Sequence, residues 1–102
     1  EEYNKSNRKL FETFIDYIIN EDIKVAFFLA SYHPYAAEKL KNSKFKIFEI
    51  EKYLKKIAKR KNIKIIGSYN PEVTNLSEND FYDGNHPKKQ GIEKIFSGYN
   101  GI

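Results

Sequence analysis

The sequence predicts an α/β protein built around two parallel strands, at about residues 24–30 and 63–67, flanked by helices. Residues 23–30 are a nearly unbroken apolar run, which is typical of a strand covered on both faces rather than one that faces water. A second, shorter apolar run lies at residues 63–67, after a long amphipathic stretch. Strand, helix and strand in this order compose a βαβ unit, in which the two strands are parallel.

A first amphipathic helix is expected over residues 4–20, before the first strand. Its apolar residues recur at helical spacing, and we expect them to form one buried stripe. They are Leu10, Phe11, Phe14, Ile15 and Ile18.

Two helices are expected between the strands. Pro34 disfavours helical geometry at the preceding residue, so a short helix is expected over residues 35–41, ending near Asn42 and Ser43. A longer helix is expected over residues 44–61. Its inner face carries Ile47, Ile50, Leu54 and Ile57, and its outer face carries Lys52, Lys55, Lys56, Lys59 and Arg60.

After the second strand, residues 68–86 read as a long polar connection, and loops of this length in compact domains are usually functional or mobile. Pro87 suits the first position of a final helix, and Gly98 is a natural end for it. The apolar stripe of this helix is formed by Ile92, Ile95 and Phe96.

Composition limits the classes of function. With 102 residues, of which 40% are hydrophobic, the chain suits one domain rather than two. It has no cysteine, which excludes disulfides and thiolate metal sites. No apolar run approaches the ~20 residues of a membrane-spanning helix. A net charge of +4 permits weak attraction to polyanions without indicating a specific nucleic-acid partner. The absence of methionine, an initiator included, suggests a piece excised from a longer chain.

Candidate site residues gather where the chain leaves the two strands. In open parallel sheets, ligands bind beyond the carboxyl ends of the strands. Three segments should meet at that edge: residues 31–33, residues 68–70, and the loop that carries Asp83 and His86. The candidates for contact with a substrate there are Tyr32, His33 and Tyr69.

Asp83 and His86 form the motif with the clearest chemistry. They lie three residues apart in the sequence Asp-Gly-Asn-His-Pro, just before the final helix. A carboxylate and an imidazole in this arrangement suit an orienting acid and a general base.

The order strand, helix, strand, polar loop, Asp-x-x-His-Pro and helix resembles the C-terminal half of the SGNH hydrolases, also called the GDSL esterase/lipase superfamily. The matching residues are Asp83, His86 and Pro87, with Gly91 in the following helix and the strand at residues 63–67 ahead of the loop. The resemblance implies a three-layer α/β/α, flavodoxin-like sandwich. It also implies that His86 is the base that activates a serine, and that Asp83 holds the imidazole in the correct tautomer.

Other blocks of the family are absent. The chain has no Gly-Asp-Ser nucleophile block, and it lacks the glycine and Asn-Asp elements that supply oxyanion donors. We therefore expect residues 1–102 to be a single domain that is the C-terminal portion of a larger SGNH-like domain, with its serine upstream. Ser31 and Ser68 lie at the right edge, but neither is in a Gly-x-Ser-x-Gly or Gly-Asp-Ser sequence, so neither is expected to be the nucleophile.

The resemblance implies a serine esterase or acyltransferase that needs no cofactor. Its substrate would be an ester-linked acyl group, on a carbohydrate or cell-envelope polymer. The residues shown carry no targeting segment, so the compartment stays open, with the cell envelope as one location that the resemblance allows. Hydrolysis and acyl transfer both remain open. Residues 1–102 alone are expected to be inactive, because a base without a nucleophile cannot form an acyl-enzyme.

Each assignment has a simpler alternative. Asp83 could cap a turn while His86 is merely a polar surface residue, and His33 could be a turn residue before proline. The tyrosines could lie at the rim of the core without a ligand, and the lysine-rich helix face suits a solvated surface better than a nucleic-acid or lipid site. A metal site is not expected, because His33, His86 and Asp83 include no short-spaced ligand signature.

The alternative function is a noncatalytic, self-associating α/β interaction module. A two-stranded parallel sheet leaves the apolar edge at residues 25–29 unpaired, and such an edge recruits another strand or chain. A homo-oligomer is therefore expected under either hypothesis.

Overall fold

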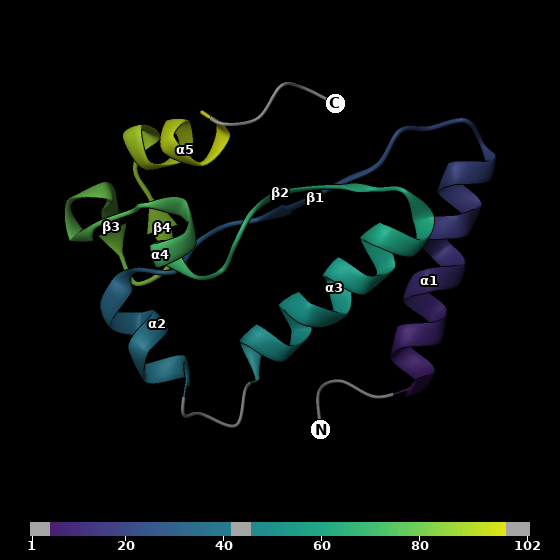
Figure 1. The fold of residues 1–102 in the computed structure, drawn as a ribbon, viewed down its shortest axis with the longest axis horizontal. Helices are drawn as coiled ribbons and strands as arrows, with labels where there is room; N and C mark the ends of the chain where they lie inside the picture. Colours follow the sequence, from purple (N-terminus) through teal and green to yellow (C-terminus); the bar gives the residue numbers. More distant parts are fainter. Residues whose placement is uncertain (1–4, 42–45, 98–102) are drawn as a thin grey trace.

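The computed structural model describes residues 5–41 and 46–97, and Figure 1 shows how their helices and strands are arranged. The helices are α1 (Lys5–Asn20), α2 (Pro34–Lys41), α3 (Ile47–Lys61), α4 (Pro71–Thr74) and α5 (Lys89–Phe96), with a 3-10 turn, η1, at Glu78–Asp80. The strands are β1 (Ala26–Leu29), β2 (Lys64–Gly67), β3 (Phe81–Asp83) and β4 (His86–Pro87). The predicted mixture of helix and sheet is confirmed.

Strands β1 and β2 are parallel neighbours, with Ala26 opposite Lys64 and Leu29 opposite Gly67. Because α2 and α3 connect them, the predicted βαβ order is confirmed, although both strands are shorter than their apolar runs. Gly67 has a φ of 86°, and a Cβ there would lie 2.5 Å from the Leu29 carbonyl oxygen, so this strand end requires glycine. In the described part of the chain this sheet has two strands, so the edge of β1 away from β2 carries no partner strand.

Apolar clusters lie on both faces of this sheet, because successive strand residues point to opposite faces. On one face, α1 and α3 supply Ile15 and Ala58, which pack with Ile63 and with partly buried residues of both strands. On the other face, α5 and the segment before it contact β2. This second cluster contains Ile66, Leu76, Phe81 and Ile95, with Ala26 and Ile92 packed against it. Figure 1 shows α3 and α5 on opposite sides of the two strands.

The buried side of α1 differs from the prediction. The prediction placed Leu10 and Phe14 in the buried stripe, but their side chains are 70% and 58% exposed. The residues that contact the sheet and α3 are Phe11, Ile15 and Ile19. These three recur at intervals of four and so share one face, whereas Leu10 and Phe14 lie on a neighbouring face. The apolar residues of α1 therefore extend around more of the helix than the sheet and α3 bury, and Leu10 and Phe14 remain exposed.

The connection at residues 68–86 is more structured than predicted. It contains α4, η1 and β3, and β3 pairs antiparallel with β4. Asn70 caps α4 by accepting a hydrogen bond from the Glu72 amide at 3.0 Å, and Pro71 occupies its first turn. Short polar residues at caps and turns account for the polar composition of this segment.

The assignment of Pro87 to the final helix was wrong. Pro87 lies in β4 opposite Phe81, and α5 begins at Lys89. The chain is still extended at Lys88, whose amide donates to the Asp80 carbonyl oxygen at 2.7 Å. The predicted ends near Asn42, Ser43 and Gly98 lie outside the described residues.

Helix α3 is capped at its C-terminus by Asn62, which has a φ of 60° in the left-handed region. The amides of Asn62 and Ile63 both donate to the Ala58 carbonyl oxygen, the second at 2.8 Å. Asparagine tolerates this conformation better than most residues, so it directs the chain from α3 into β2.

Candidate acid–base site

The three segments expected at the carboxyl edge of the sheet do meet there. Ser31 Oγ donates to the Ser68 carbonyl oxygen at 2.6 Å, and the Tyr32 amide donates to the Tyr69 carbonyl oxygen at 3.1 Å. The His33 amide donates to the Gly84 carbonyl oxygen at 2.9 Å, which ties the turn between Asp83 and His86 to the segment after β1.

Asp83 and His86 lie on either side of the tight turn between β3 and β4. Nδ1 of His86 is 2.7 Å from Oδ1 of Asp83 and 3.0 Å from Oδ2. Both side chains are exposed, at 59% for Asp83 and 69% for His86. The antiparallel pair thus holds a carboxylate against one nitrogen of an accessible imidazole.

The Asp83 carboxylate also shapes the turn. Its Oδ1 accepts a hydrogen bond from the Asn85 amide at 3.1 Å, which is the geometry of an Asx turn. This amide is the main reason that the pKa of Asp83 lies below its ordinary value, and the hydrogen bond with His86 is the next. The simpler alternative is confirmed for Asp83, which shapes the turn, and the same carboxylate has a second contact, with His86.

The hydrogen bond fixes the chemistry of the imidazole. An ionised carboxylate can only accept, so Nδ1 of His86 carries the proton. In the neutral ring the lone pair is then on Nε2, the nitrogen that can take a proton from another group. No hydrogen bond to Nε2 comes from residues 5–41 or 46–97.

Tyr32 and Tyr69 are brought together next to this turn segment. Their ring centroids are 5.9 Å apart, and both side chains are half-buried. Burial raises the pKa of Tyr69, and the neighbouring Tyr32 and Glu51 add to the effect. The Tyr69 amide donates to the carboxylate of Glu51, a residue of α3, at 2.9 Å. This hydrogen bond fixes the backbone of Tyr69 to α3.

His33 is a second histidine on the same edge, but its ring is engaged differently. Its Nδ1 accepts a hydrogen bond from the Tyr35 amide at 3.0 Å, as in a residue that shapes the start of α2. The ring lies against Phe81, with centroids 5.5 Å apart. Both features fit the simpler interpretation of His33 as a turn residue.

Ser31 and Ser68 are each only 1% exposed. Ser31 Oγ lies 2.7 Å from the Thr74 hydroxyl as well as bonding the Ser68 carbonyl, and Ser68 Oγ donates to the Glu51 carboxylate at 2.7 Å. Their hydroxyls therefore connect buried segments and are closed to a substrate, in line with the expectation that neither is a nucleophile.

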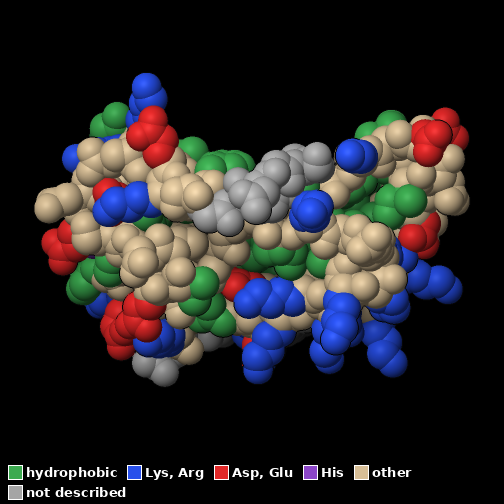
Figure 2. Space-filling model, turned by 45° about the horizontal axis from the view of Figure 1, so that its top comes forward, with side chains coloured by type: hydrophobic (Ala, Val, Ile, Leu, Met, Phe, Trp, Pro, Cys, Tyr) green, Lys and Arg blue, Asp and Glu red, His purple; other side chains and the backbone are tan. Residues whose placement is uncertain are grey.

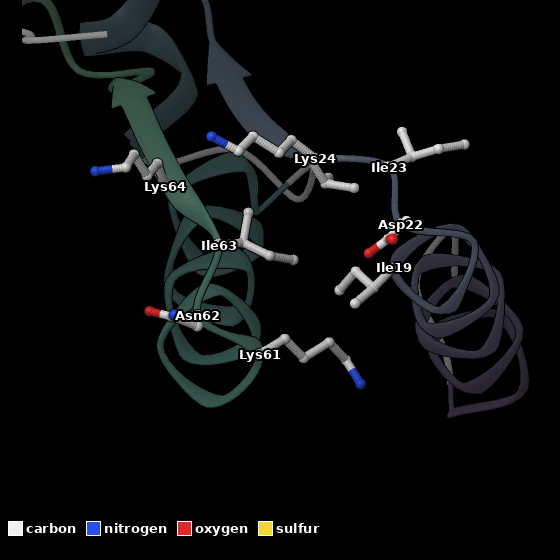
Figure 3. Close-up of a pocket in the computed structure, with 9 residues that line it drawn as sticks. Ile19, Asp22, Ile23, Lys24, Lys61, Asn62, Ile63 and Lys64 are labelled. Atoms are coloured by element: carbon white, nitrogen blue, oxygen red, sulfur yellow. The ribbon is translucent and has the colours of Figure 1, made fainter. Parts of the chain in front are cut away.

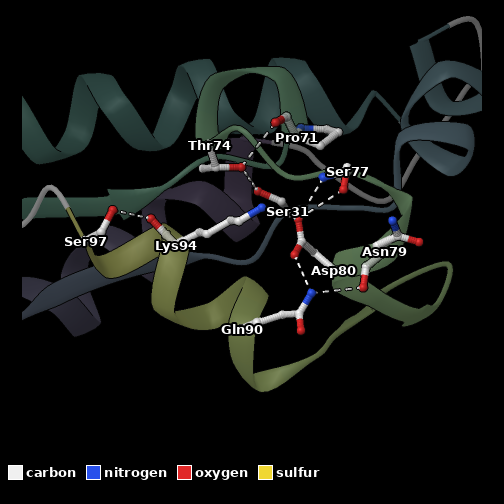
Figure 4. Close-up of polar contacts among 9 residues, drawn as sticks. All are labelled: Ser31, Pro71, Thr74, Ser77, Asn79, Asp80, Gln90, Lys94 and Ser97. Carbon is white, nitrogen blue, oxygen red and sulfur yellow. Dashed lines mark hydrogen bonds and ion pairs between the residues drawn. The ribbon is translucent and has the colours of Figure 1, made fainter.

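Asp80 is a buried carboxylate that the sequence analysis missed, and Figure 4 shows its surroundings. Its side chain is 1% exposed. It accepts hydrogen bonds from the Ser77 amide at 2.9 Å, from Gln90 Nε2 at 2.9 Å and from Lys94 Nζ at 2.9 Å. These contacts, the Ser77 amide first, hold the pKa of Asp80 far below its ordinary value.

Asp80 joins η1 to α5, directly before β3. Gly91 allows this close approach, since a Cβ there would lie 2.8 Å from the Asp80 carbonyl oxygen. The sequence signal for Asp80 was the Ser77–Asp80 spacing of a capping box, which the structure contains. Asp80 thus fixes the start of β3, the strand that carries Asp83, against α5.

A pocket of about 350 Å³ lies at the opposite end of the sheet, where both strands begin (Figure 3). Its walls include Ile19, Ile23 and Ile63, and Lys61 reaches across to Asp16 at 2.6 Å. It is remote from the acid–base pair, which adjoins the carboxyl ends of the strands.

The basic residues of α3 form an exposed face. Figure 2 shows Lys and Arg side chains gathered along the lower side of the molecule. Two of them are paired: Lys55 with Glu51 at 3.2 Å, and Arg60 with Glu12 at 2.8 Å. The charge of this face is partly neutralised within the chain, as the solvated-surface interpretation expects.

Within the described ranges, no three His, Asp or Glu side chains are grouped so that they could hold a metal ion. Nor does any helix there combine the length and apolar character needed to cross a membrane. No family model, curated protein or solved structure matches the chain. The fold and the site therefore define the protein only as a small α/β protein with an exposed carboxylate–imidazole pair.

Proposed function

We propose that residues 1–102 are the C-terminal portion of a serine esterase or acyltransferase with an SGNH-like α/β/α sandwich. Asp83 and His86 are the acid and base of its Ser-His-Asp triad. The observation that supports this is the 2.7 Å hydrogen bond between His86 Nδ1 and Asp83, which leaves Nε2 as the basic nitrogen.

In this mechanism a serine outside residues 1–102 attacks the ester carbonyl carbon, and Nε2 of His86 takes the hydroxyl proton. The imidazolium then returns that proton to the oxygen of the leaving alcohol as the ester bond breaks. Asp83 stabilises the imidazolium and keeps the ring oriented. Water or an acceptor hydroxyl, deprotonated by the same His86, then releases the acyl group.

Support also comes from the place of the pair in the fold. It adjoins the carboxyl ends of two parallel strands, which is where open α/β sheets bind ligands. Tyr32, His33 and Tyr69 lie at the same edge and are the candidates for contact with the substrate. The proposed substrate, an acyl ester of a carbohydrate or cell-envelope polymer, rests on the resemblance alone.

The test uses the full-length natural protein and a p-nitrophenyl ester. His86→Ala and Asp83→Asn should each lower kcat by about 10³-fold or more, because the serine loses its base or the base loses its orientation. The matched control is Asp16→Asn, which removes an exposed carboxylate on α1 and should leave turnover unchanged. Unchanged esterase activity in the His86→Ala protein would refute the assignment.

A second measurement uses residues 1–102 alone, which should show no turnover dependent on His86. Robust turnover that His86→Ala abolishes would show that the nucleophile lies within this chain, and it would overturn the proposal that it lies outside.

A second candidate function is the noncatalytic, self-associating module. It is favoured by the unpaired edge of β1 and by the large apolar side chains exposed on α1. Retention of the full-length protein's function in a His86→Ala variant would favour this candidate.

A further inference from the structure

Glu51 is a buried carboxylate on α3 that the proposed mechanism does not use. Its side chain is 8% exposed, and it pairs at 3.2 Å with Lys55, whose side chain is 57% exposed. Burying a carboxylate costs more free energy than burying an apolar side chain, unless hydrogen bonds compensate. The groups that donate hydrogen bonds to Glu51 therefore indicate what this charge does.

Both carboxylate oxygens of Glu51 accept hydrogen bonds from the segment that follows β2. Oε2 accepts from Ser68 Oγ at 2.7 Å, and Oε1 accepts from the Tyr69 amide at 2.9 Å. Ser68 Oγ in turn accepts from the Asn70 amide at 3.0 Å. One carboxylate thus orders three consecutive residues at the carboxyl end of β2.

The carbonyl groups of the same segment hold the residues that follow β1. The Ser68 carbonyl oxygen accepts from Ser31 Oγ at 2.6 Å, and the Tyr69 carbonyl oxygen accepts from the Tyr32 amide at 3.1 Å. The rings of Tyr32 and Tyr69 meet with their centroids 5.9 Å apart, and both side chains are half-buried. Among the described residues, neither tyrosine hydroxyl takes part in a hydrogen bond, so both are available to a ligand.

These contacts connect Glu51 to the sheet edge at which the acid–base pair lies. We propose that Glu51 is a positioning residue of the candidate site: its carboxylate fixes the backbone of Tyr69, so that Tyr69 and Tyr32 form a wall that binds the substrate. The identity of this substrate, an acyl ester, rests on the proposed function. Glu51 then acts through substrate binding, and so on KM, whereas His86 acts through proton transfer and so on kcat.

Two substitutions at position 51 separate this role from simple packing. Glu51→Met keeps a long side chain in the buried site but removes both acceptors. In the full-length protein acting on a p-nitrophenyl ester, it should raise KM about tenfold and change kcat less than about twofold, because the tyrosine wall contacts bound substrate and transition state alike. Glu51→Gln should keep KM within about threefold of the wild type, since its side-chain oxygen can still accept from the Tyr69 amide.

A double-mutant cycle tests whether Glu51 acts through Tyr69. Tyr69→Ala should itself raise KM about tenfold, and adding Glu51→Met should then raise it less than about twofold more, because both changes remove the same contact. The matched control is Glu49→Gln, an exposed carboxylate on the same helix, which should leave KM unchanged. Effects of Glu51→Met and Tyr69→Ala that multiply in full would overturn the proposal.

A smaller change tests the same segment in case Glu51→Met does not fold, which circular dichroism decides. Ser68→Ala removes the hydroxyl that links Glu51 to the Asn70 amide, and it should raise KM about threefold, since the amide of Tyr69 keeps its own hydrogen bond to Glu51. A wild-type KM in a folded Glu51→Met protein, or in Ser68→Ala, would refute the role of Glu51.

The ionisation of Tyr69 gives a readout that needs no catalysis. Burial, then the neighbouring Tyr32 and Glu51, raise the pKa of Tyr69. The absorbance of tyrosinate, taken as the difference between each protein and its Tyr69→Phe counterpart, should therefore show Tyr69 ionising at lower pH in Glu51→Met than in the wild type. An unchanged titration would overturn the positioning of Tyr69 by Glu51, whatever the activity. Esterase activity that survives His86→Ala would instead refute the proposed function and leave this titration as the test of Glu51.

Discussion

Replacing Asp80 by alanine should destabilise the protein far more than removing any exposed carboxylate. The side chain is 1% exposed and accepts three hydrogen bonds of 2.9 Å, from Ser77, Gln90 and Lys94. A hydrogen bond to a charged group contributes about 1.5–3 kcal/mol net. Three such bonds set an upper bound of about 5–9 kcal/mol, but Lys94 and Gln90 can turn to water in the variant. We therefore expect a loss of about 3 kcal/mol in the free energy of unfolding.

The assay is urea unfolding of the wild-type protein, Asp80→Ala and Asp16→Ala. Asp16 is a matched control because it pairs with Lys61 at 2.6 Å while its side chain is 54% exposed. An exposed ion pair of this kind contributes about 0–1 kcal/mol. If Asp80→Ala cost no more than Asp16→Ala, the reasoning that burial and three donors anchor α5 to η1 would be refuted.

The same carboxylate predicts a dependence of stability on pH. Because the pKa of Asp80 is lowered on folding from its ordinary value of 3.8, its contribution is fully present above that value. The contribution is lost as the pH falls from 3.8 toward the lower pKa of the folded state. Below pH 4 the wild-type protein should therefore lose stability more steeply than Asp80→Ala. Equal slopes in acid would contradict the assignment.

The other stability predictions concern the backbone. Gly91→Ala should cost about 1–3 kcal/mol, because the new methyl would lie 2.8 Å from the Asp80 carbonyl oxygen. Gly84→Ala is its control and should stay within about 0.5 kcal/mol, since its Cβ would meet only the Ala36 methyl at 3.9 Å. Asn62→Ala should destabilise by about 1 kcal/mol and Asn62→Gly should not, because only the first places an ordinary side chain at a φ of 60°. Thermal unfolding measures both pairs, and equal losses within either pair would count against the steric argument.

The regular elements could be predicted because their signals are local. The apolar run at residues 23–30 and the amphipathic pattern before residue 62 each depend on a few adjacent residues, and they gave β1, α3 and β2 in the right order. The two ends of the acid–base motif are also close in sequence, so Asp83 and His86 could be paired from their spacing. Their function stays a prediction.

The parts that could not be predicted depend on distant partners. Asp80 looks like a surface residue in a polar segment, and its burial follows from Gln90 and Lys94, ten and fourteen residues later. Pro87 suits a helix start as well as a strand, and the pairing of β3 with β4 decided between them. The direction in which α1 faces likewise depends on α3 and the sheet, not on its own sequence.

Because Asp83 contacts both the Asn85 amide and His86, acid affects the turn and the imidazole together. The carboxylate that bends the chain through the Asn85 amide is also the partner of the imidazole, so protonating it weakens both contacts at once. The side-chain oxygen of an asparagine at position 83 can still accept from the Asn85 amide, but it carries no charge to act on His86. Asp83→Asn therefore separates the shape of the loop from the basicity of His86. Under the proposed function, position 83 requires aspartate to act on His86, whereas asparagine is sufficient to shape the turn.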